Sequence, residues 1–243
     1  KNYDITYQTK QRGFQFFPYG YRKNTTEIPF SPSLTMSFTD NSRRCLRWMR
    51  RFRHRRGYNI HSPFAFNLVT GVIYERGAYY AYDDLRNLRK TVPSKLRERD
   101  DRLLLRLINA SMAKEALVIG DGLQMQTAYL RAGRPSCLFR EITTSDLRTS
   151  QGNALKIHPV KVDFLYLDAP LELWPSAWKA VLPKRGEKAF FVVRGIHRSK
   201  NDFAAWQRLT EDAAVRVTFD LHDFGIACFE ARFNKENHLI NYF

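Results

Sequence analysis

The sequence predicts an α/β fold, in which a mostly parallel sheet has helices on both faces and ends in an antiparallel hairpin. From residue 115 onward, short apolar runs alternate with amphipathic stretches. Such a strand–helix alternation implies parallel strands that helices cover on both faces. Residues 215–233 contain two apolar runs joined by a short turn, which is typical of a hairpin. The residues before 114 follow a helical period instead, so N-terminal helices precede the sheet.

The sequence divides into three parts: an N-terminal extension at 1–40, a helical region at 41–113 and a sheet domain at 114–243. The extension mixes aromatic, polar and basic residues without a sustained period, and the first methionine is Met36. Two interpretations stay open for residues 1–35. They are either an upstream extension that is not natively translated, or an aromatic-rich arm that docks on the domain.

Residues 41–56 predict a basic amphipathic helix. Cys45, Trp48, Met49 and Phe52 recur at i, i+3, i+4 and i+7, which places them on one stripe. Three interpretations stay open: the arginines bind the phosphates of a nucleic acid or another polyanion, the helix lies on an anionic membrane, or the stripe packs on the main domain. The arginines are eight in number: Arg43, Arg44, Arg47, Arg50, Arg51, Arg53, Arg55 and Arg56.

Three further helices are expected before the sheet. The first begins at Pro63 with Ser62 as its N-cap, because proline is favoured in a first turn and serine at a cap. The second begins near Asp83. The third covers residues 94–113, and its buried face consists of Leu103, Leu104, Leu107 and Ile108.

The sheet domain is expected to alternate in chain order. Strands are predicted at 115–120, 136–142, 162–168 and 188–194, and the hairpin strands follow within 215–233. Helices are predicted at 125–133, 172–182 and 199–213, the last with Ser199 and Asp202 as a capping box. Only about twenty residues separate Glu141 from Val162, which leaves room for one short helix at most.

Composition limits the function classes. Forty Lys and Arg against twenty-four Asp and Glu give a formal charge of +16, which favours anionic partners such as nucleic acid, an anionic membrane or acidic proteins. The absence of a long apolar run and of a secretory leader predicts a cytoplasmic protein. Cys45, Cys137 and Cys228 are far apart, which indicates buried free thiols.

Several motifs resemble a known family. They are Ile60-His61-Ser62-Pro63-Phe64 with Tyr79-Tyr80-Ala81-Tyr82, then Val118-Ile119-Gly120-Asp121-Gly122, then Val162 to Asp168, and Ile196-His197 with Ser199. Together they resemble class I S-adenosylmethionine-dependent methyltransferases of a Bacteroidetes type, over roughly residues 57–243. The resemblance implies a Rossmann-like methyltransferase sheet. The short interval between Glu141 and Val162 leaves the third strand of that sheet in doubt.

The resemblance also implies a cofactor site for S-adenosylmethionine. Gly120 and Gly122 would form the tight turn that approaches the cofactor, Glu141 would bind the ribose hydroxyls, and Asp168 would lie at the ligand crevice. His197 is the candidate general base, since its ordinary pKa is near 6.5. No metal is expected.

Departures from the family pattern predict a degenerate member. Leu123 and Met125 follow where a second glycine is usual, Ala169 follows Asp168, and Arg194 stands where metal-dependent members carry acids. Two functions therefore stay open. The first is a metal-independent methyltransferase of unknown acceptor. The second is a catalytically inactive homologue that binds nucleic acid or another anionic partner through the arginines of 43–56.

Overall fold

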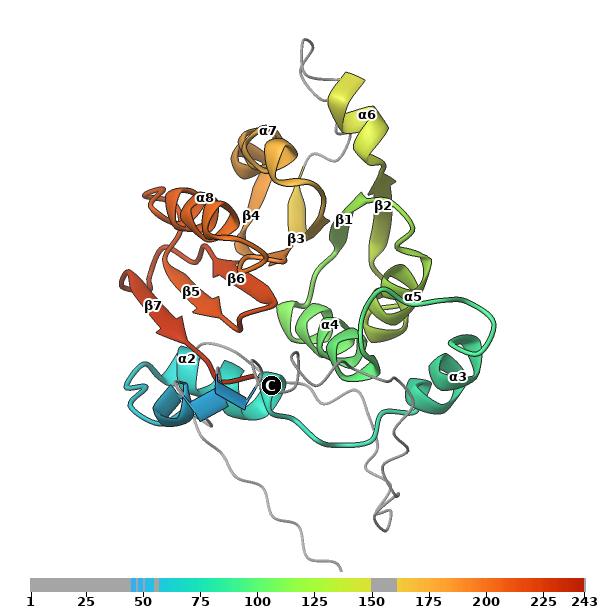
Figure 1. Ribbon diagram of the computed structural model, residues 1–243, viewed down its shortest axis with the longest axis horizontal. Helices are drawn as coiled ribbons and strands as arrows, with labels where there is room; N and C mark the ends of the chain where they lie inside the picture. The colour runs from blue at the N-terminus through green and yellow to red at the C-terminus, as the bar shows by residue number, and fades with distance from the viewer. Residues whose placement is uncertain (1–44, 47, 50, 55–56, 150–160, 243) are drawn as a thin grey trace, which may run out of the picture.

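A computed structural model of the chain describes residues 45–46, 48–49, 51–54, 57–149 and 161–242. These residues form a seven-stranded sheet with helices on both of its faces (Figure 1). The predicted extension at 1–40 lies outside the described residues, as do parts of the predicted helix at 41–56.

Seven strands make up the sheet in the described part of the chain. They are β1 Glu115–Gly120, β2 Leu138–Ile142, β3 Val162–Asp168, β4 Arg185–Arg194, β5 Val217–Asp220, β6 Phe224–Cys228 and β7 Glu236–Leu239. The α-helices are α2 Pro63–Leu68, α3 Ala81–Leu88, α4 Glu98–Ser111, α5 Gln124–Gly133, α6 Thr144–Thr149, α7 Trp174–Val181 and α8 Lys200–Thr210. A π-helical turn, Val69–Ile73, continues α2, and short 3₁₀ turns occur at Phe52–His54, Leu171–Leu173 and Leu182–Lys184.

The strand order is β2-β1-β3-β4-β6-β5-β7. Strands β2, β1, β3 and β4 are parallel, and β6 runs antiparallel to both β4 and β5. The predicted mixed α/β sheet with an antiparallel C-terminal hairpin is therefore confirmed. The N-cap predictions are also confirmed, because the side chains of Ser62 and Ser199 accept hydrogen bonds from the N–H groups of Ala65 and Asp202.

In the part of the chain that the structure describes, the sheet does not contain the strand that the short interval after Glu141 left doubtful. Within the described residues no strand pairs with the outer edge of β2, and the short helix α6 follows it. The seventh strand is instead β7, which adds to the opposite edge in parallel with β5. Sequence analysis missed β7 because its residues, ENHL, show no run of apolar or β-branched side chains.

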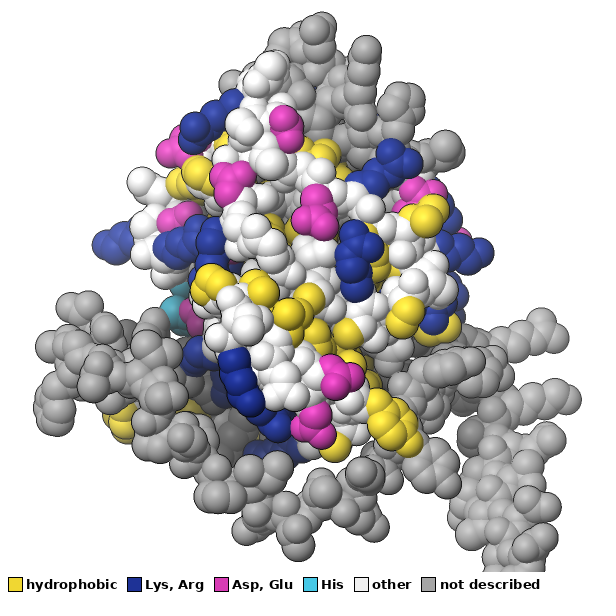
Figure 2. Space-filling model, turned by 90° about the vertical axis from the view of Figure 1, so that its right-hand side faces the viewer, with side chains coloured by type: hydrophobic (Ala, Val, Ile, Leu, Met, Phe, Trp, Pro, Cys, Tyr) yellow, Lys and Arg dark blue, Asp and Glu magenta, His cyan; other side chains and the backbone are white. Residues whose placement is uncertain are grey.

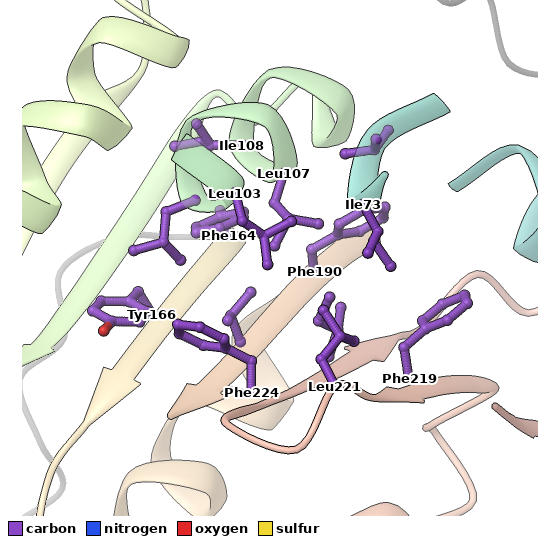
Figure 3. Packing of buried hydrophobic residues seen from close by; sticks show 14 of the residues in the cluster. Ile73, Leu103, Leu107, Ile108, Phe164, Tyr166, Phe190, Phe219, Leu221 and Phe224 are labelled. Carbon is purple, nitrogen blue, oxygen red and sulfur yellow. The ribbon is translucent and has the colours of Figure 1, made fainter. Parts of the chain in front are cut away.

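The sheet buries apolar side chains on both faces. On one face α4 places Leu103, Leu107 and Ile108 over Phe164 and Phe190, as Figure 3 shows. This confirms the predicted buried face of the third helix, although α4 begins at Glu98 and not at 94. The opposite face packs on α7 and α8, with Trp174 fully buried there. Each Å² of apolar area removed from water stabilises a fold by roughly 25 cal/mol, so these two layers supply the main stabilisation here.

The predicted N-terminal stripe does not pack on the sheet. Cys45, Trp48, Met49 and Phe52 are all exposed, whereas Arg51 is buried. The interpretation in which the stripe packs on the main domain is therefore wrong for these residues. The expectation of buried thiols is correct for Cys137 and Cys228 and wrong for Cys45.

Candidate functional site

The carboxyl ends of the parallel strands meet at one edge of the sheet. The chain leaves β1 toward β2 on one side, whereas β3 lies on the other side of β1. Such a reversal of strand order opens a crevice where open α/β sheets bind ligands. The register pairs Gly120 with Asp168 across this switch point. The structure therefore brings together three of the predicted cofactor residues: Gly120, Gly122 and Asp168.

The turn after β1 requires glycine for two different reasons. Gly120 has a φ of +145°, and a Cβ atom there would overlap the backbone carbonyl oxygen of Asp168. Gly122 has a φ of +61°, which L-residues adopt at a cost, but its nearest neighbour would be the side chain of Lys95 at 3.5 Å. The first glycine thus allows β1 and β3 to approach, and the second shapes a turn that is open on the outside.

Asp168 is almost fully buried and holds two arginines. Its Oδ2 accepts a hydrogen bond from Arg194 at 2.6 Å, and its Oδ1 accepts one from Arg198 at 2.7 Å. Burial opposes the charge on Arg194, but the Asp168 carboxylate outweighs it and raises the pKa of that guanidinium above its usual value. Both carboxylate oxygens are therefore already occupied by cations from the end of β4 and the loop that follows.

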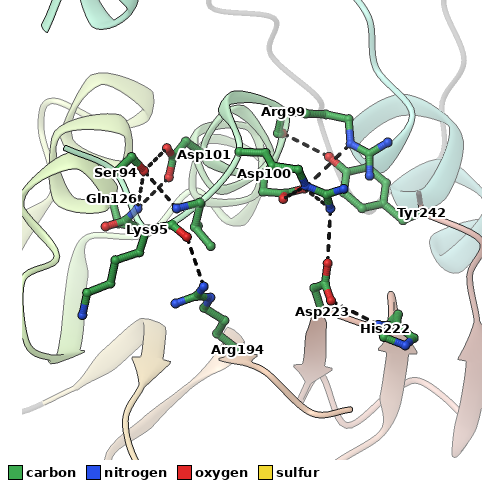
Figure 4. Close-up of polar contacts among 12 residues, drawn as sticks. Ser94, Lys95, Arg99, Asp100, Asp101, Gln126, Arg194, His222, Asp223 and Tyr242 are labelled. Atoms are coloured by element: carbon green, nitrogen blue, oxygen red, sulfur yellow. Dashed lines mark hydrogen bonds and ion pairs between the residues drawn. The ribbon is translucent and has the colours of Figure 1, made fainter. Parts of the chain in front are cut away.

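A segment that sequence analysis did not assign to the site crosses this edge. Residues 94–97 precede α4, and Figure 4 shows Lys95 facing Arg194 at the end of β4. The carbonyl of Lys95 accepts a hydrogen bond from Arg194 at 3.2 Å, and its Nζ donates to the carbonyl of Asp121. Arg97 forms an ion pair of 3.2 Å with Asp223. We call residues 94–97 the strap.

A buried acid holds the strap in place. Asp101 is fully buried and accepts hydrogen bonds from Ser94 at 2.6 Å, from Gln126 at 2.9 Å and from Arg89. Burial raises the pKa of this carboxyl, although these hydrogen bonds oppose the rise. A sequence signal existed, because Asp101 shares its helix face with Leu104, Leu105 and Ile108 at i+3, i+4 and i+7.

Asp121 joins the loops after β1 and β2. Its Oδ1 accepts a hydrogen bond of 2.9 Å from the N–H of Thr144, and its Oδ2 accepts one from the Thr144 hydroxyl. These hydrogen bonds lower the pKa of Asp121 below its usual value. The contact joins the loop after β1 to the end of β2, the strand that carries the predicted ribose ligand Glu141.

The structure does not bring Glu141 to the switch point. Glu141 pairs in register with Val118, two residues before Gly120, and its carboxylate lies 3.5 Å from Arg131 of α5. Both side chains of this ion pair are about half exposed. The role of Glu141 as ribose ligand stays a prediction.

His197 lies in a second cluster at the same sheet edge. Its Nε2 is 2.7 Å from Oδ2 of Asp220, at the end of β5, and 3.2 Å from Nη2 of Arg51. The imidazole ring stacks on Phe203 and His222, with centroid distances of 4.4 and 4.9 Å. Arg51 also forms an ion pair of 3.0 Å with Asp220, so this arginine is a buried structural contact and not an exposed one.

The ionised Asp220 should make the stability of the wild-type fold depend on pH in the acid range. Burial raises the pKa of Asp220, but hydrogen bonds and charges from His197 and Arg51 outweigh it and lower the pKa below 3.8. A carboxyl with a depressed pKa stabilises the fold at neutral pH, and this contribution is lost as the pH falls below 3.8 through the folded pKa.

We therefore expect Asp220→Asn to lower the free energy of unfolding by about 2 kcal/mol at pH 7, with a difference from the wild type that shrinks in acid. Denaturant titrations at pH 7 and across the acid range measure it. Asp84→Asn, an exposed acid on α3, is the control and should change little. A difference for Asp220→Asn that is constant with pH would contradict the assignment.

The acids and histidines of the described residues do not gather into a metal-binding group. No three His, Cys, Asp or Glu side chains of that part of the chain lie together with the geometry to hold a metal ion. At the switch point the reason is electrostatic, because Arg194 and Arg198 stand beside Asp168 and repel a cation. None of the described helices is long and apolar enough to cross a membrane.

No protein-family model matches the chain, and no curated protein matches it. The solved structures that are similar to this chain include three methyltransferases. The O-methyltransferase TomG from Streptomyces achromogenes, in complex with SAM, is 14% identical, with a TM-score of 0.44 over 63% of this chain and 90% of TomG. An O-methyltransferase from Bacillus cereus, in complex with SAH, is 10% identical, with a TM-score of 0.42 over 63% and 91%. The SAH-bound methyltransferase PaMTH1 from Podospora anserina is 11% identical, with a TM-score of 0.44 over 82% and 98%.

Proposed function

We propose that this chain is a metal-independent, methyltransferase-like protein that binds S-adenosylmethionine at the switch point between β1 and β3. The observation that carries the proposal is the close approach of Gly120 to the backbone of Asp168, which leaves the Gly122 turn open at the crevice. The motifs at 60–64 and 196–199 support its assignment to the Bacteroidetes-type family.

The residues at the switch point fit the amino-acid part of this cofactor. S-adenosylmethionine carries an ammonium, a carboxylate and a positive sulfonium group. Asp168 offers the anion that such cations need, and Arg194 and Arg198 offer partners for the carboxylate. Arg198 is the more exposed of the two arginines and the easier one to displace.

The cofactor supplies an electrophilic methyl group, and the chain's own residues position it. The strap is held in place beside the proposed cofactor site. Lys95 contacts Arg194 at the end of β4 and Asp121 after β1, and Arg97 pairs with Asp223 after β5. An acceptor that carries a proton also needs a base. In this proposal Nε2 of His197 donates to Asp220, so that Nδ1 keeps the lone pair that accepts the proton.

Isothermal titration of the full chain with S-adenosylmethionine, and with its demethylated product, tests the proposal. We expect saturable heats with one site per chain. Asp168→Ala should abolish them, and Asp84→Asn, on the exposed side of α3, should leave them unchanged. No heat from either ligand at millimolar concentration would contradict cofactor binding.

A second candidate function is a catalytically inactive homologue. It is favoured by the occupation of both Asp168 oxygens by arginines, and by the Asp121–Thr144 contact, which joins the loop after β1 to the end of β2. This candidate predicts no heat in the same titration. Its function would then lie in the basic segment at 43–56, through an anionic partner.

A further inference from the structure

A tyrosine hydroxyl is buried beside the switch point without a hydrogen-bond partner. Tyr166 of β3 is 0% exposed, and none of the residues that the structure describes forms a hydrogen bond with its hydroxyl. Its partners in register are Val118 of β1 and Val192 of β4, whose side chains are apolar. A buried hydroxyl without a partner has lost its hydration and destabilises the fold. The stability of the fold therefore does not explain the choice of a tyrosine at this position.

This hydroxyl lies on the face of the sheet that also carries the carboxylate of Asp168. Side chains two residues apart on a strand point to the same face, so Tyr166 and Asp168 are neighbours on one side of β3. The apolar cluster on this face contains Phe164 and Phe190, and a phenylalanine ring would fill the space of the tyrosine ring as well. Figure 3 shows the hydroxyl pointing away from the other labelled side chains of the cluster.

The charges around the hydroxyl favour a cationic donor. Burial raises the pKa of Tyr166 well above its usual value, so the hydroxyl is neutral at physiological pH. Among the charged groups Asp168 acts on it most strongly and raises the pKa further, whereas Arg194 opposes the rise. This preference is local, because acidic and basic side chains are interspersed on the side of the molecule that Figure 2 shows. A neutral oxygen beside Asp168 can accept a hydrogen bond from a positively charged group.

A second acceptor without a partner lies beside the strap. Gln126 of α5 is 0% exposed, and its Nε2 donates to Oγ of Ser94 and to Oδ1 of Asp101, at 2.9 Å each. The amide takes this orientation because a carboxylate only accepts hydrogen bonds. Its Oε1 is left buried and without a partner in the described part of the chain. The same edge of the sheet thus holds two buried oxygens that a ligand could supply with a donor.

We propose that Tyr166 contacts the ligand of the proposed cofactor site and that its hydroxyl oxygen accepts a hydrogen bond from the ligand's ammonium group. The inference rests on the proposed function, because S-adenosylmethionine brings that ammonium. Asp168 supplies the opposite charge and Tyr166 a neutral acceptor, which together favour an ammonium over an uncharged group. Tyr166 is fully buried, so the site has to open, and we place this opening at the strap, where Lys95 joins the ends of β1 and β4.

The variant Tyr166→Phe removes the hydroxyl and keeps the ring. Without ligand, we expect its Tm to rise by about 3 °C, because the fold no longer buries an unpartnered hydroxyl. Its affinity for S-adenosylhomocysteine, measured by isothermal titration of the full chain, should fall about tenfold, because the hydrogen bond to the ammonium is lost. Stability and binding then change in opposite directions, which partial unfolding of the variant would not produce.

Tyr129→Phe is the matched control. Tyr129 of α5 is also 0% exposed, and its hydroxyl likewise has no partner within the described ranges, but it packs with Tyr82 and Met125 in a separate cluster. We expect a similar rise in Tm and an unchanged affinity. A second control changes the ligand. For the analogue of S-adenosylhomocysteine that carries hydrogen in place of the ammonium group, Tyr166→Phe should leave the affinity unchanged.

Four results would overturn the proposal. A lower Tm of Tyr166→Phe would mean that the hydroxyl has a partner in the folded chain. An unchanged affinity of this variant for S-adenosylhomocysteine, or an equal loss for the analogue without the ammonium, would remove the hydroxyl from the site and leave the proposed function intact. Failure of the wild-type chain to bind S-adenosylhomocysteine would contradict the proposed function, and this inference with it.

Discussion

A Gly120→Ala variant is expected to lose at least about 3 kcal/mol of its free energy of unfolding, because the substitution combines a severe overlap with backbone strain. The added Cβ would overlap the carbonyl oxygen of Asp168 and approach Cδ1 of Leu123 to 2.9 Å, and the residue would have to keep a φ of +145°. The overlapping atom is backbone and cannot rotate away, so β1 and β3 would have to separate where their register pairs these two residues.

Gly122→Ala is the matched control, since it lies in the same turn. Its φ of +61° is the left-handed helical region, and the closest atom to an added Cβ is Cε of Lys95 at 3.5 Å. We expect a cost of about 1 kcal/mol, the ordinary penalty of a left-handed residue. Denaturant titration of both variants gives the comparison. Equal losses would show that the approach of β1 to Asp168 does not require a glycine at 120.

The central strands could be predicted because their signal is local. The apolar runs at 115–120 and 162–168 end at a glycine and an acid, and the structure has the same bounds for β1 and β3. Pattern also fixed the buried face of α4, because four apolar side chains recur at helical spacing. The sequence of β7 carries no such local signal. β7 pairs with β5, and the side chains of Thr218 and Asn237 share a hydrogen bond of 2.6 Å across this pair.

The site was only partly predictable, because its polar pairs join residues far apart in sequence. The two glycines and Asp168 follow from position at strand ends. The partners of Asp168 do not, because nothing local indicates that Arg194 and Arg198 turn toward it. Arg51 is the extreme case, since it pairs with a residue 169 positions away. Inward packing of the apolar residues of 41–56 was one of three interpretations that stayed open, whereas the structure turns Arg51 inward to this long-range ion pair.

Replacement of Asp168 by alanine is expected to lower the free energy of unfolding by about 2 kcal/mol, because it leaves two guanidinium groups without their common partner. The side chain of Asp168 is 6% exposed, whereas those of Arg194 and Arg198 are 23% and 44% exposed. Full burial of all three would give a larger loss, but both arginines can recover part of their hydration once the acid is gone.

Double-mutant cycles separate the two arginines. The coupling of Asp168 to Arg194 should be about 1–2 kcal/mol, whereas the coupling to the more exposed Arg198 should stay below about 1 kcal/mol. Each cycle combines Asp168→Ala with an arginine-to-alanine change and is measured in denaturant. Equal couplings would contradict the difference in burial. The order matters for the proposed cofactor site, because a ligand ammonium that takes the place of a guanidinium at Asp168 would displace the more weakly coupled Arg198.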